Sequence, residues 1–284
     1  MISIISLLIM IMIILIAFIY KAYRNTKDVT INRIYLEQAS RHEYNEELII
    51  LQLSDLHLEN ISISPNELYE KLKDEAIDLI ALTGDFLDRK KTIPKLIPYL
   101  KVLNQLKPTF GIYAVLGNHD YVLRKNVQML KDTLQQYGCQ VMQNENELIK
   151  VKDKHVNLIG IDDFSTKRSN VAKAYTGIKQ GTNVVLTHDP NIVLTMKNVH
   201  FDYLLAGHFH GGQICYPKAY HLIKMGKLVR MNKIKGLHEH DGKRFYINEG
   251  LGQTGVNIRM GSRPEITFHH VPLTHPKIES QPAM

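Results

Sequence analysis

The chain has 284 residues, of which 44% are hydrophobic and 22% charged, so its composition is that of a globular protein and excludes a disordered one. The formal net charge of +7 favours an anionic partner such as phospholipid, a phosphorylated substrate or nucleic acid, without choosing among them. The two cysteines, Cys139 and Cys215, have no CxxC spacing, so neither a disulfide framework nor a thiolate zinc site is predicted.

Residues 1–20 form an apolar run, MISIISLLIMIMIILIAFIY, in which two serines are the only clearly polar side chains. A helix of this length spans about 30 Å, the thickness of a bilayer core. The run has neither a basic start nor a small-residue cleavage site, which favours a membrane anchor over a signal peptide. Lys21, Arg24 and Lys27 follow at once, so the positive-inside rule predicts a single-pass cell-membrane protein with a cytoplasmic body. The expected organisation is an anchor at 1–20, a basic juxtamembrane linker at 21–28, one domain at 29–273 and a flexible tail at 274–284.

Short apolar runs recur along the rest of the chain, with helical segments between them. Residues 29–36 alternate apolar and polar side chains and predict a first edge strand. The later runs are rich in Ile, Leu, Val or Tyr, as buried strands are. These predicted strands are 48–53, 77–82, 111–116, 156–161, 183–186, 201–205, 244–247 and 265–271.

Helices are predicted between these strands. Ser64 followed by Pro65 is an N-cap with proline at the first helical position, so a helix begins there and continues through residues 66–74. Further helices are predicted at residues 92–106, 126–137 and 191–197. The alternation of strands and helices indicates an α/β domain, and the clustering of the later strands indicates that the sheet is not all parallel.

Five short segments carry Asp, His and Asn, and four of them begin where a predicted strand ends. Loops at the carboxyl ends of strands converge on one crevice in an open α/β sheet. The segments are SDLH at 54–57, GDFLDR at 84–89, GNHD at 117–120, THD at 187–189 and GHFHGG at 207–212. Carboxylate oxygens beside imidazole nitrogens suit a divalent ion such as Mn²⁺, Fe²⁺ or Zn²⁺.

Each segment alone is weak evidence, because DxH and HxH pairs are common and a single loop histidine is more often solvated. In this joint order the five segments resemble the calcineurin-like metallophosphoesterases, whose pattern is DxH, GDxxD, GNHD or GNHE, a single His and GHxH. The resemblance covers nearly all of the chain after the anchor. The anchor, Gln213 after the last motif and the late segments at 250–252 and 264–266 are similar to a membrane-anchored bacterial subgroup. Phe209 stands where a small or hydroxylated residue is common, and the ligand set is complete.

The resemblance implies a four-layer α/β/β/α sandwich with two mixed sheets flanked by helices. It also implies two divalent ions, Mn, Fe or Zn, that share the Asp85 carboxylate and activate a water for in-line attack on phosphorus. His119 is implied as the acid for the leaving group, with Asp120 fixing its tautomer and orientation. The implied ligands are Asp55, His57, Asp85 and His210 for one ion, and Asp85, Asn118, His188 and His208 for the other.

Other polar residues receive structural interpretations. Residues 238–240 repeat the HxH spacing but precede an Asp-Gly turn signal, so a solvated turn is expected. Residues 269–270 are expected to be structural strand histidines. Arg259 and Arg263 either meet a substrate phosphate or lie exposed, the commoner case. The basic and apolar residues of 216–244 suit either a flap for an anionic, lipid-like substrate or an ordinary surface insertion, with the insertion slightly favoured.

The sequence thus predicts a membrane-anchored, dinuclear metal-dependent phosphoesterase. Its substrate is a phosphodiester, pyrophosphate or phosphomonoester, with lipid-linked esters among the candidates. The alternatives are a nucleotide or phosphoprotein phosphatase, since the metal core does not choose the substrate, and a non-catalytic metal-binding scaffold. The scaffold would need a lost ligand or a replaced His119, and neither is seen. Nucleic acid is not an expected partner, because the net positive charge is the sole feature that favours nucleic-acid binding. The oligomeric state is left open.

Overall fold

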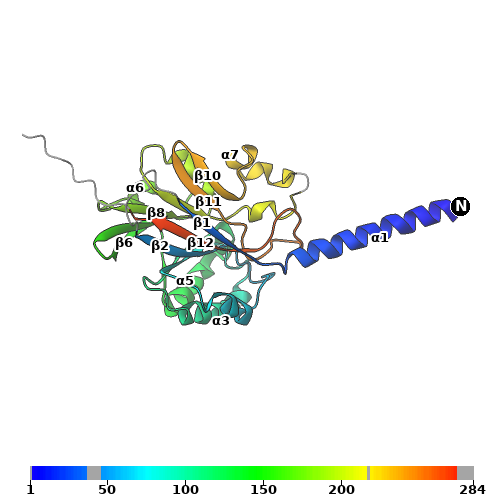
Figure 1. Ribbon diagram of the computed structural model, residues 1–284, viewed down its shortest axis with the longest axis horizontal. Helices are drawn as coiled ribbons and strands as arrows, with labels where there is room; N and C mark the ends of the chain where they lie inside the picture. Colours follow the sequence, from blue (N-terminus) through cyan, green and yellow to red (C-terminus); the bar gives the residue numbers. More distant parts are fainter. Residues whose placement is uncertain (1, 37–45, 216–217, 274–284) are drawn as a thin grey trace, which may run out of the picture.

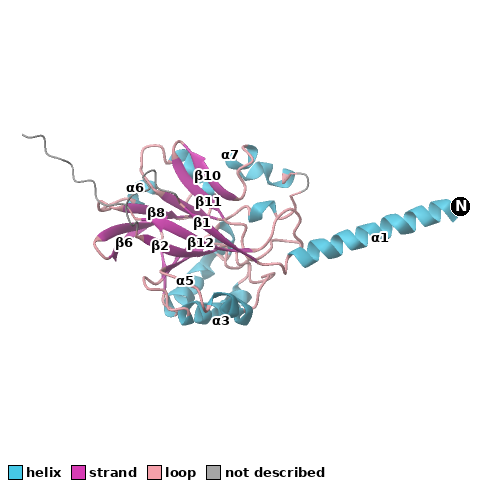
Figure 2. Ribbon diagram, in the orientation of Figure 1, coloured by secondary structure: helices cyan, strands magenta, loops and turns pink. Residues whose placement is uncertain are grey.

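Two mixed sheets pack face to face and helices cover their outer faces (Figures 1 and 2). The computed structural model describes residues 2–36, 46–215 and 218–273. In spatial order, the first sheet contains β1 (Thr30–Tyr35), β12 (Glu265–Pro272), β2 (Glu47–Leu53), β3 (Leu79–Thr83), β4 (Ile112–Val115) and β5 (Cys139–Val141). The second sheet contains β10 (Gly236–His240), β11 (Lys243–Ile247), β9 (Tyr203–Ala206), β8 (Thr182–Leu186), β7 (Lys154–Gly160) and β6 (Glu145–Val151). The expected four-layer sandwich is confirmed.

Strand β2 illustrates why the central strands are almost continuously apolar. Leu48 and Ile50 point into the core between the two sheets, whereas Leu51 and Leu53 point into the core beneath the helices. Successive side chains of a strand point to opposite faces, so a strand covered on both faces needs apolar residues at nearly every position. These continuous runs are the signal that predicted the central strands.

The helices form two outer layers. Apolar side chains of the first layer pack on the first sheet. This layer consists of α2 (Pro65–Leu72), α3 (Ile93–Gln105) and α5 (Val127–Gln136). The layer on the second sheet consists of α6 (Val171–Ala174), α7 (Lys227–Arg230) and the 3₁₀ helices η3 (Pro190–Thr195) and η5 (Tyr220–Met225). Shorter helices are η1 (Lys90–Thr92), α4 (Asn118–Val122), η2 (Arg124–Asn126) and η4 (His210–Gly212).

The predicted start of α2 is confirmed. The Ser64 side chain accepts a hydrogen bond from the Glu67 backbone amide, and the Glu67 side chain accepts one from the Ser64 amide. Two backbone donors that the helix leaves free are satisfied in this way. The helix predicted at 191–197 is instead the 3₁₀ helix η3, which begins at Pro190.

Three strands were not predicted, namely β5, β6 and β10, and all three lie at sheet edges. Each of them contains exposed side chains, so polar residues interrupt the continuous apolar run that marks a central strand. The expectation of a solvated turn at 238–240 is therefore wrong, because these residues belong to β10. The expected tail at 274–284 lies outside the described residues.

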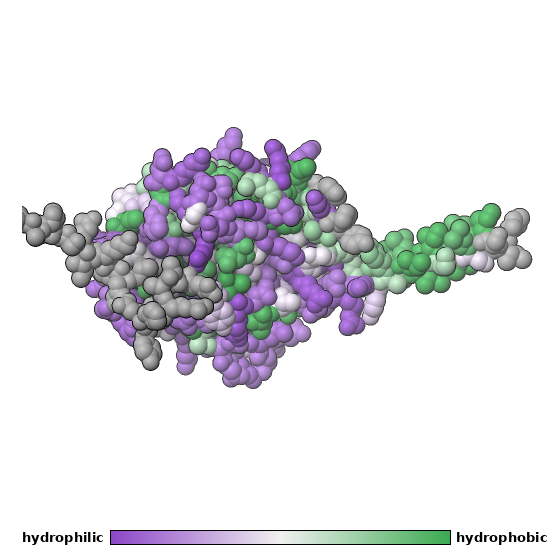
Figure 3. Space-filling model, turned by 45° about the horizontal axis from the view of Figure 1, so that its top comes forward, coloured by the Kyte–Doolittle hydropathy of each residue, from purple (hydrophilic) through white to green (hydrophobic). Residues whose placement is uncertain are grey.

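Helix α1 (Ile2–Asn25) projects from one end of the domain as a hydrophobic rod (Figures 1 and 3). It is long and apolar enough to cross a membrane. The residues expected to form a linker, 21–28, include the last turn of this helix, and Ala22 in that turn and Thr26 directly after it are buried. The helix therefore reaches the surface of the domain directly.

Candidate metal centre

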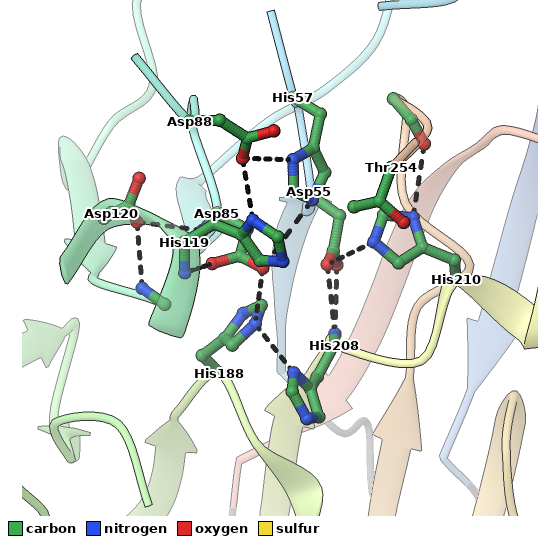
Figure 4. Close-up of polar contacts among 12 residues, drawn as sticks. Asp55, His57, Asp85, Asp88, His119, Asp120, His188, His208, His210 and Thr254 are labelled. Carbon is green, nitrogen blue, oxygen red and sulfur yellow. Dashed lines mark hydrogen bonds and ion pairs between the residues drawn. The ribbon is translucent and has the colours of Figure 1, made fainter. Parts of the chain in front are cut away.

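The predicted ligands lie together at the carboxyl ends of central strands from both sheets (Figure 4). Parallel strands within each sheet end on the same side, so the loops that follow them meet there. Asp55 and His57 follow β2, Asp85 follows β3, Asn118 follows β4, His188 follows β8, and His208 and His210 follow β9. The sheet-to-sheet packing thus joins segments that are up to 155 residues apart in the sequence, from Asp55 to His210.

Three groups of three side chains bring their ligand atoms within 4.8 Å of one another, and two of them consist of predicted ligands alone; the third is His57, Asp88 and His119. The first group is Asp55, His57 and His210, with His210 Nε2 3.3 Å from Asp55 Oδ1. The second is Asp85, His188 and His208, with His188 Nε2 3.0 Å from Asp85 Oδ2. Asp85 Oδ2 also lies 3.6 Å from His57 Nε2, so this carboxylate lies between the two groups. All six side chains are buried.

Backbone carbonyls orient two of the histidines. His188 Nδ1 lies 2.8 Å from the Thr83 carbonyl oxygen, and His210 Nδ1 lies 3.2 Å from that of Gly252. Since a carbonyl only accepts, each Nδ1 carries a proton, and Nε2 is the ring nitrogen that faces the carboxylates. Burial lowers the pKa of His210 to about 3, so its imidazole is neutral, the form that binds metal.

Two further buried ligand atoms have no hydrogen-bond partner within the described part of the chain, namely His57 Nε2 and Asn118 Oδ1. Buried polar atoms are nearly always paired, so each of these atoms calls for a partner. Divalent cations in the centre would supply these partners. The donor set of imidazole nitrogens, carboxylate oxygens and one amide oxygen fits Mn²⁺, Fe²⁺ or Zn²⁺.

The backbone is strained around the centre. Non-glycine residues with a left-handed φ are uncommon and cluster at functional sites. Five of the predicted ligands have φ between 33° and 76°: Asp55, His57, Asp85, His208 and His210. The loops also pass very close to the carboxylates, since a Cβ on Gly117 would lie 2.1 Å from Asp85 Oδ1 and one on Gly207 2.2 Å from Asp55 Oδ2.

His119 lies beside both groups, and its imidazole contacts Asp88. The distance from His119 Nδ1 to Asp88 Oδ1 is 2.8 Å, and the same oxygen lies 3.3 Å from His57 Nδ1. Burial alone would lower the pKa of His119, but the hydrogen bond to Asp88 and the charge of Asp85 raise it to about 9. Asp88 belongs to the GDxxD motif, but the sequence predicts no role for it, because no residue pattern reveals its contacts with His57 and His119.

The structure gives Asp88 the contact that was expected of Asp120. The Asp120 carboxylate instead accepts hydrogen bonds of 2.8–2.9 Å from the backbone amides of Asp85, Phe86 and Gly117. These amides belong to the loops after β3 and β4, so Asp120 joins the two loops that carry Asp85 and His119. Its closeness in sequence to His119 was a misleading signal, because α4 turns the two side chains in different directions.

Arg259 is fully buried, contrary to both expectations for it. Its guanidinium donates hydrogen bonds of 2.7–3.0 Å to the carbonyl oxygens of Glu249, Gly250 and Gly252. The Gly252 oxygen is the one that faces His210 Nδ1. Sequence reasoning missed this role because all of its partners are backbone atoms, which leave no residue pattern.

The backbone of Arg259 contacts α1. Its amide donates to the Ala22 carbonyl oxygen at 2.9 Å, and its carbonyl oxygen accepts from Asn25 Nδ2 at 3.0 Å. Arg263 is exposed, as expected, and pairs with Asp28. A single residue therefore connects the end of α1 with the loop behind His210.

Two cavities open at the centre. The larger, of about 890 Å³, is lined by Asn118 and His208 among others, and the smaller, of about 290 Å³, by Asp85 and His119. Met225 of η5 lines both. The basic segment 216–244, for which an ordinary surface insertion was slightly favoured, therefore forms part of the wall of the site.

Comparison with known proteins identifies the family. Residues 48–212 match the calcineurin-like phosphoesterase family. The chain is 62% identical over 255 residues to the uncharacterized metallophosphoesterase YkoQ of Bacillus subtilis, and the aligned region covers 89% of this chain and 94% of that protein. It is 28% identical over 245 residues to an uncharacterized metallophosphoesterase of Helicobacter pylori, covering 83% of this chain and 61% of that one. It is 27% identical over 274 residues to the UDP-2,3-diacylglucosamine pyrophosphatase LpxG of Chlamydia muridarum, covering 77% and 82%. The chain belongs to the calcineurin-like phosphoesterases and is a metallophosphoesterase, a hydrolase.

Proposed function

We propose that the protein is a membrane-anchored phosphoesterase that uses two divalent ions bridged by Asp85. The observation that carries this proposal is the position of the Asp85 carboxylate between the two ligand groups, 3.0 Å from His188 and 3.6 Å from His57. When bound, the ions supply an activated hydroxide and neutralise charge on the phosphoryl oxygens. Asp55, His57, Asp85 and His210 would hold one ion, and Asp85, Asn118, His188 and His208 the other.

His119 is proposed as the acid that protonates the leaving oxygen. Its Nδ1 is engaged by Asp88, and its side chain lines the smaller cavity, so the proton on Nε2 is the one available to substrate. The raised pKa, about 9, keeps this proton in place at neutral pH. Asp120 acts at a distance, by holding the loops that carry Asp85 and His119.

The substrate is proposed to be a phosphodiester, pyrophosphate or phosphomonoester, with lipid-linked esters among the candidates. Support comes from the apolar helix α1 and from the LpxG relative, whose name describes a pyrophosphatase of a diacylated sugar nucleotide. The basic residues that end α1 favour a cytoplasmic body. Protease added to intact cells tests this orientation, and digestion of the body from outside would overturn it.

Asp85→Asn tests the two-ion proposal. We expect hydrolysis of bis-p-nitrophenyl phosphate with Mn²⁺ to fall by more than about a hundredfold, since even outer partners of metal ligands cost 10–100-fold. Metal analysis should show fewer bound ions in the variant. Asp132→Asn is the matched control, because Asp132 is an exposed carboxylate on α5, remote from the centre. Turnover by Asp85→Asn within twofold of the wild type would refute the bridging role.

A further inference from the structure

The larger cavity beside the metal centre has a strongly basic lining. At its inner end it reaches Asn118 and His208, where the proposed ions would meet a phosphoryl group. Three exposed lysines line it, Lys167, Lys224 and Lys227, and we call it the lysine cavity. The lysines come from two separate segments, one after β7 and one at the junction of η5 and α7. Their convergence therefore results from the fold and not from a single run of basic residues.

The lining offers little negative charge to offset these lysines. Of the described residues that line the cavity, Asp189 is the one acidic residue. Its Oδ1 accepts two hydrogen bonds from Asn191, from the backbone amide at 2.9 Å and from Nδ2 at 2.7 Å. Asp189 is also buried, so it does not compete for the exposed ammonium groups. A cleft with one sign of charge concentrates ligands of the opposite sign.

The turn that carries Lys224 and Lys227 is held in place. Asn191 Nδ2 donates to the Met225 carbonyl oxygen at 2.8 Å, and Asn191 Oδ1 accepts from the Leu228 amide at 3.2 Å. This buried side chain thus fastens both sides of the turn to η3. A fixed turn has little backbone entropy to lose when the lysines bind a ligand, so the cavity is pre-organised for binding.

The lining is apolar as well as basic. Phe164, Leu194 and Met225 line the cavity together with the lysines. A ligand that fits has an anionic group for the lysines and carbon-rich parts for these side chains. A simple phosphomonoester would place its single phosphate at the metal centre and leave the lysines without a partner.

We infer that the lysine cavity binds a second anionic group of the substrate, while the metal centre holds the phosphoryl group that is attacked. This inference rests on the proposed phosphoesterase function and specifies its substrate class: a diphosphate, or a phosphodiester with a charged arm. The charged arm belongs either to a lipid headgroup or to a soluble molecule. Both present the same chemistry to the lysines.

The test compares three substrates with the full chain in detergent micelles and Mn²⁺. Bis-p-nitrophenyl phosphate has no second charge, ADP-ribose is a soluble diphosphate and CDP-diacylglycerol is a lipid-borne one. The measured quantity is the ratio of kcat/KM for each diphosphate to that for bis-p-nitrophenyl phosphate. Lys224→Gln and Lys227→Gln should each lower this ratio about tenfold, the usual effect of one charge-assisted hydrogen bond. Lys224→Arg should restore most of it, because the charge is kept.

Arg230→Gln is the matched control. Arg230 is an exposed cation on α7, one turn from Lys227, and does not line the lysine cavity, so its ratio should equal that of the wild type. If the kcat/KM ratio falls for the lipid diphosphate alone, the inference is supported and the anionic group belongs to a lipid headgroup. If the ratio falls for both diphosphates, the inference is supported and the lysines recognise the anionic group on a soluble or a lipid substrate. Equal losses for all three substrates would overturn it, as would a wild type that cleaves bis-p-nitrophenyl phosphate but neither diphosphate. A wild type without metal-dependent cleavage of any substrate would contradict the proposed function instead.

Discussion

Replacing Arg259 tests whether the end of α1 and the metal centre depend on one side chain. The guanidinium makes three hydrogen bonds to buried carbonyl oxygens, at 2.8, 3.0 and 2.7 Å. Arg259→Leu removes all three and leaves the carbonyls unpaired, at a cost of about 1–3 kcal/mol for each group. Because such costs are not additive, we expect the free energy of unfolding to fall by about 3–5 kcal/mol. Arg259→Lys keeps the charge and reaches fewer of the carbonyls, so it should lose less.

The effect on metal binding separates this role from simple support of the fold. The Gly252 carbonyl, which Arg259 holds, also orients His210. Loss of such an outer partner costs 10–100-fold in metal affinity. Arg259→Lys leaves this carbonyl in place but holds it less firmly, so it should raise the Kd for Mn²⁺ by about tenfold, the lower end of that range, in calorimetric titrations well below its Tm. Arg263→Lys, an exposed change four residues away, is the control. A destabilised Arg259→Lys that binds Mn²⁺ like the wild type would refute the reasoning.

Three other substitutions test the site and the core. Asp88→Asn should remove the support that raises the pKa of His119 to about 9, so the alkaline limb of the kcat/KM profile, measured at saturating Mn²⁺, should move to lower pH; an unmoved limb would exclude His119 as the acid. Asn118→Ala should lower the number of bound ions in metal analysis, because it removes a buried oxygen that lacks another partner; full occupancy would show that Asn118 is not a ligand. Glu265→Gln addresses stability, since burial and the charge of Glu249 raise the pKa of Glu265 to about 7. In the unfolded chain this carboxyl group loses its proton near pH 4.3. The free energy of unfolding of the wild type should therefore fall by up to about 3 kcal/mol as pH rises from about 4.3 to 7, and it should stay at the lower value at higher pH. Thermal unfolding of Glu265→Gln should lack this slope and give a higher Tm above pH 7, and a slope equal to that of the wild type would contradict the assignment.

The sequence predicted the central strands and the convergence of the motifs well, and for one reason. Residues such as Asp55 and Asp85 directly follow strands covered on both faces, whose continuous apolar runs are easy to recognise. Knowing where a strand ends is enough to place the side chains that come next. The edge strand β10 could not be found in this way, because exposed and half-buried residues alternate along it, and His238, Glu239 and His240 interrupt any apolar run.

Contacts between a side chain and backbone atoms could not be predicted either. Arg259 binds carbonyl oxygens, and Asp120 binds amides, so neither has a partner that a residue pattern can reveal. The left-handed backbone of Asp55 and Asp85 is equally hidden, since no glycine stands at these positions. In each case the tertiary structure imposes the local geometry against the usual preference of the residue.

The attachment of α1 to the domain would limit the orientations and heights that the domain can take above a membrane. A domain on a flexible stalk swings through many orientations and reaches targets at many heights. Here the hydrogen bonds of Ala22 and Asn25 with Arg259 fasten the end of the helix to the domain. With α1 in a bilayer, the cavities would stay at a nearly constant distance from the membrane surface. The protein would then encounter its substrates by lateral diffusion in two dimensions. The length of α1 outside the lipid would set this distance, because each helical residue adds about 1.5 Å.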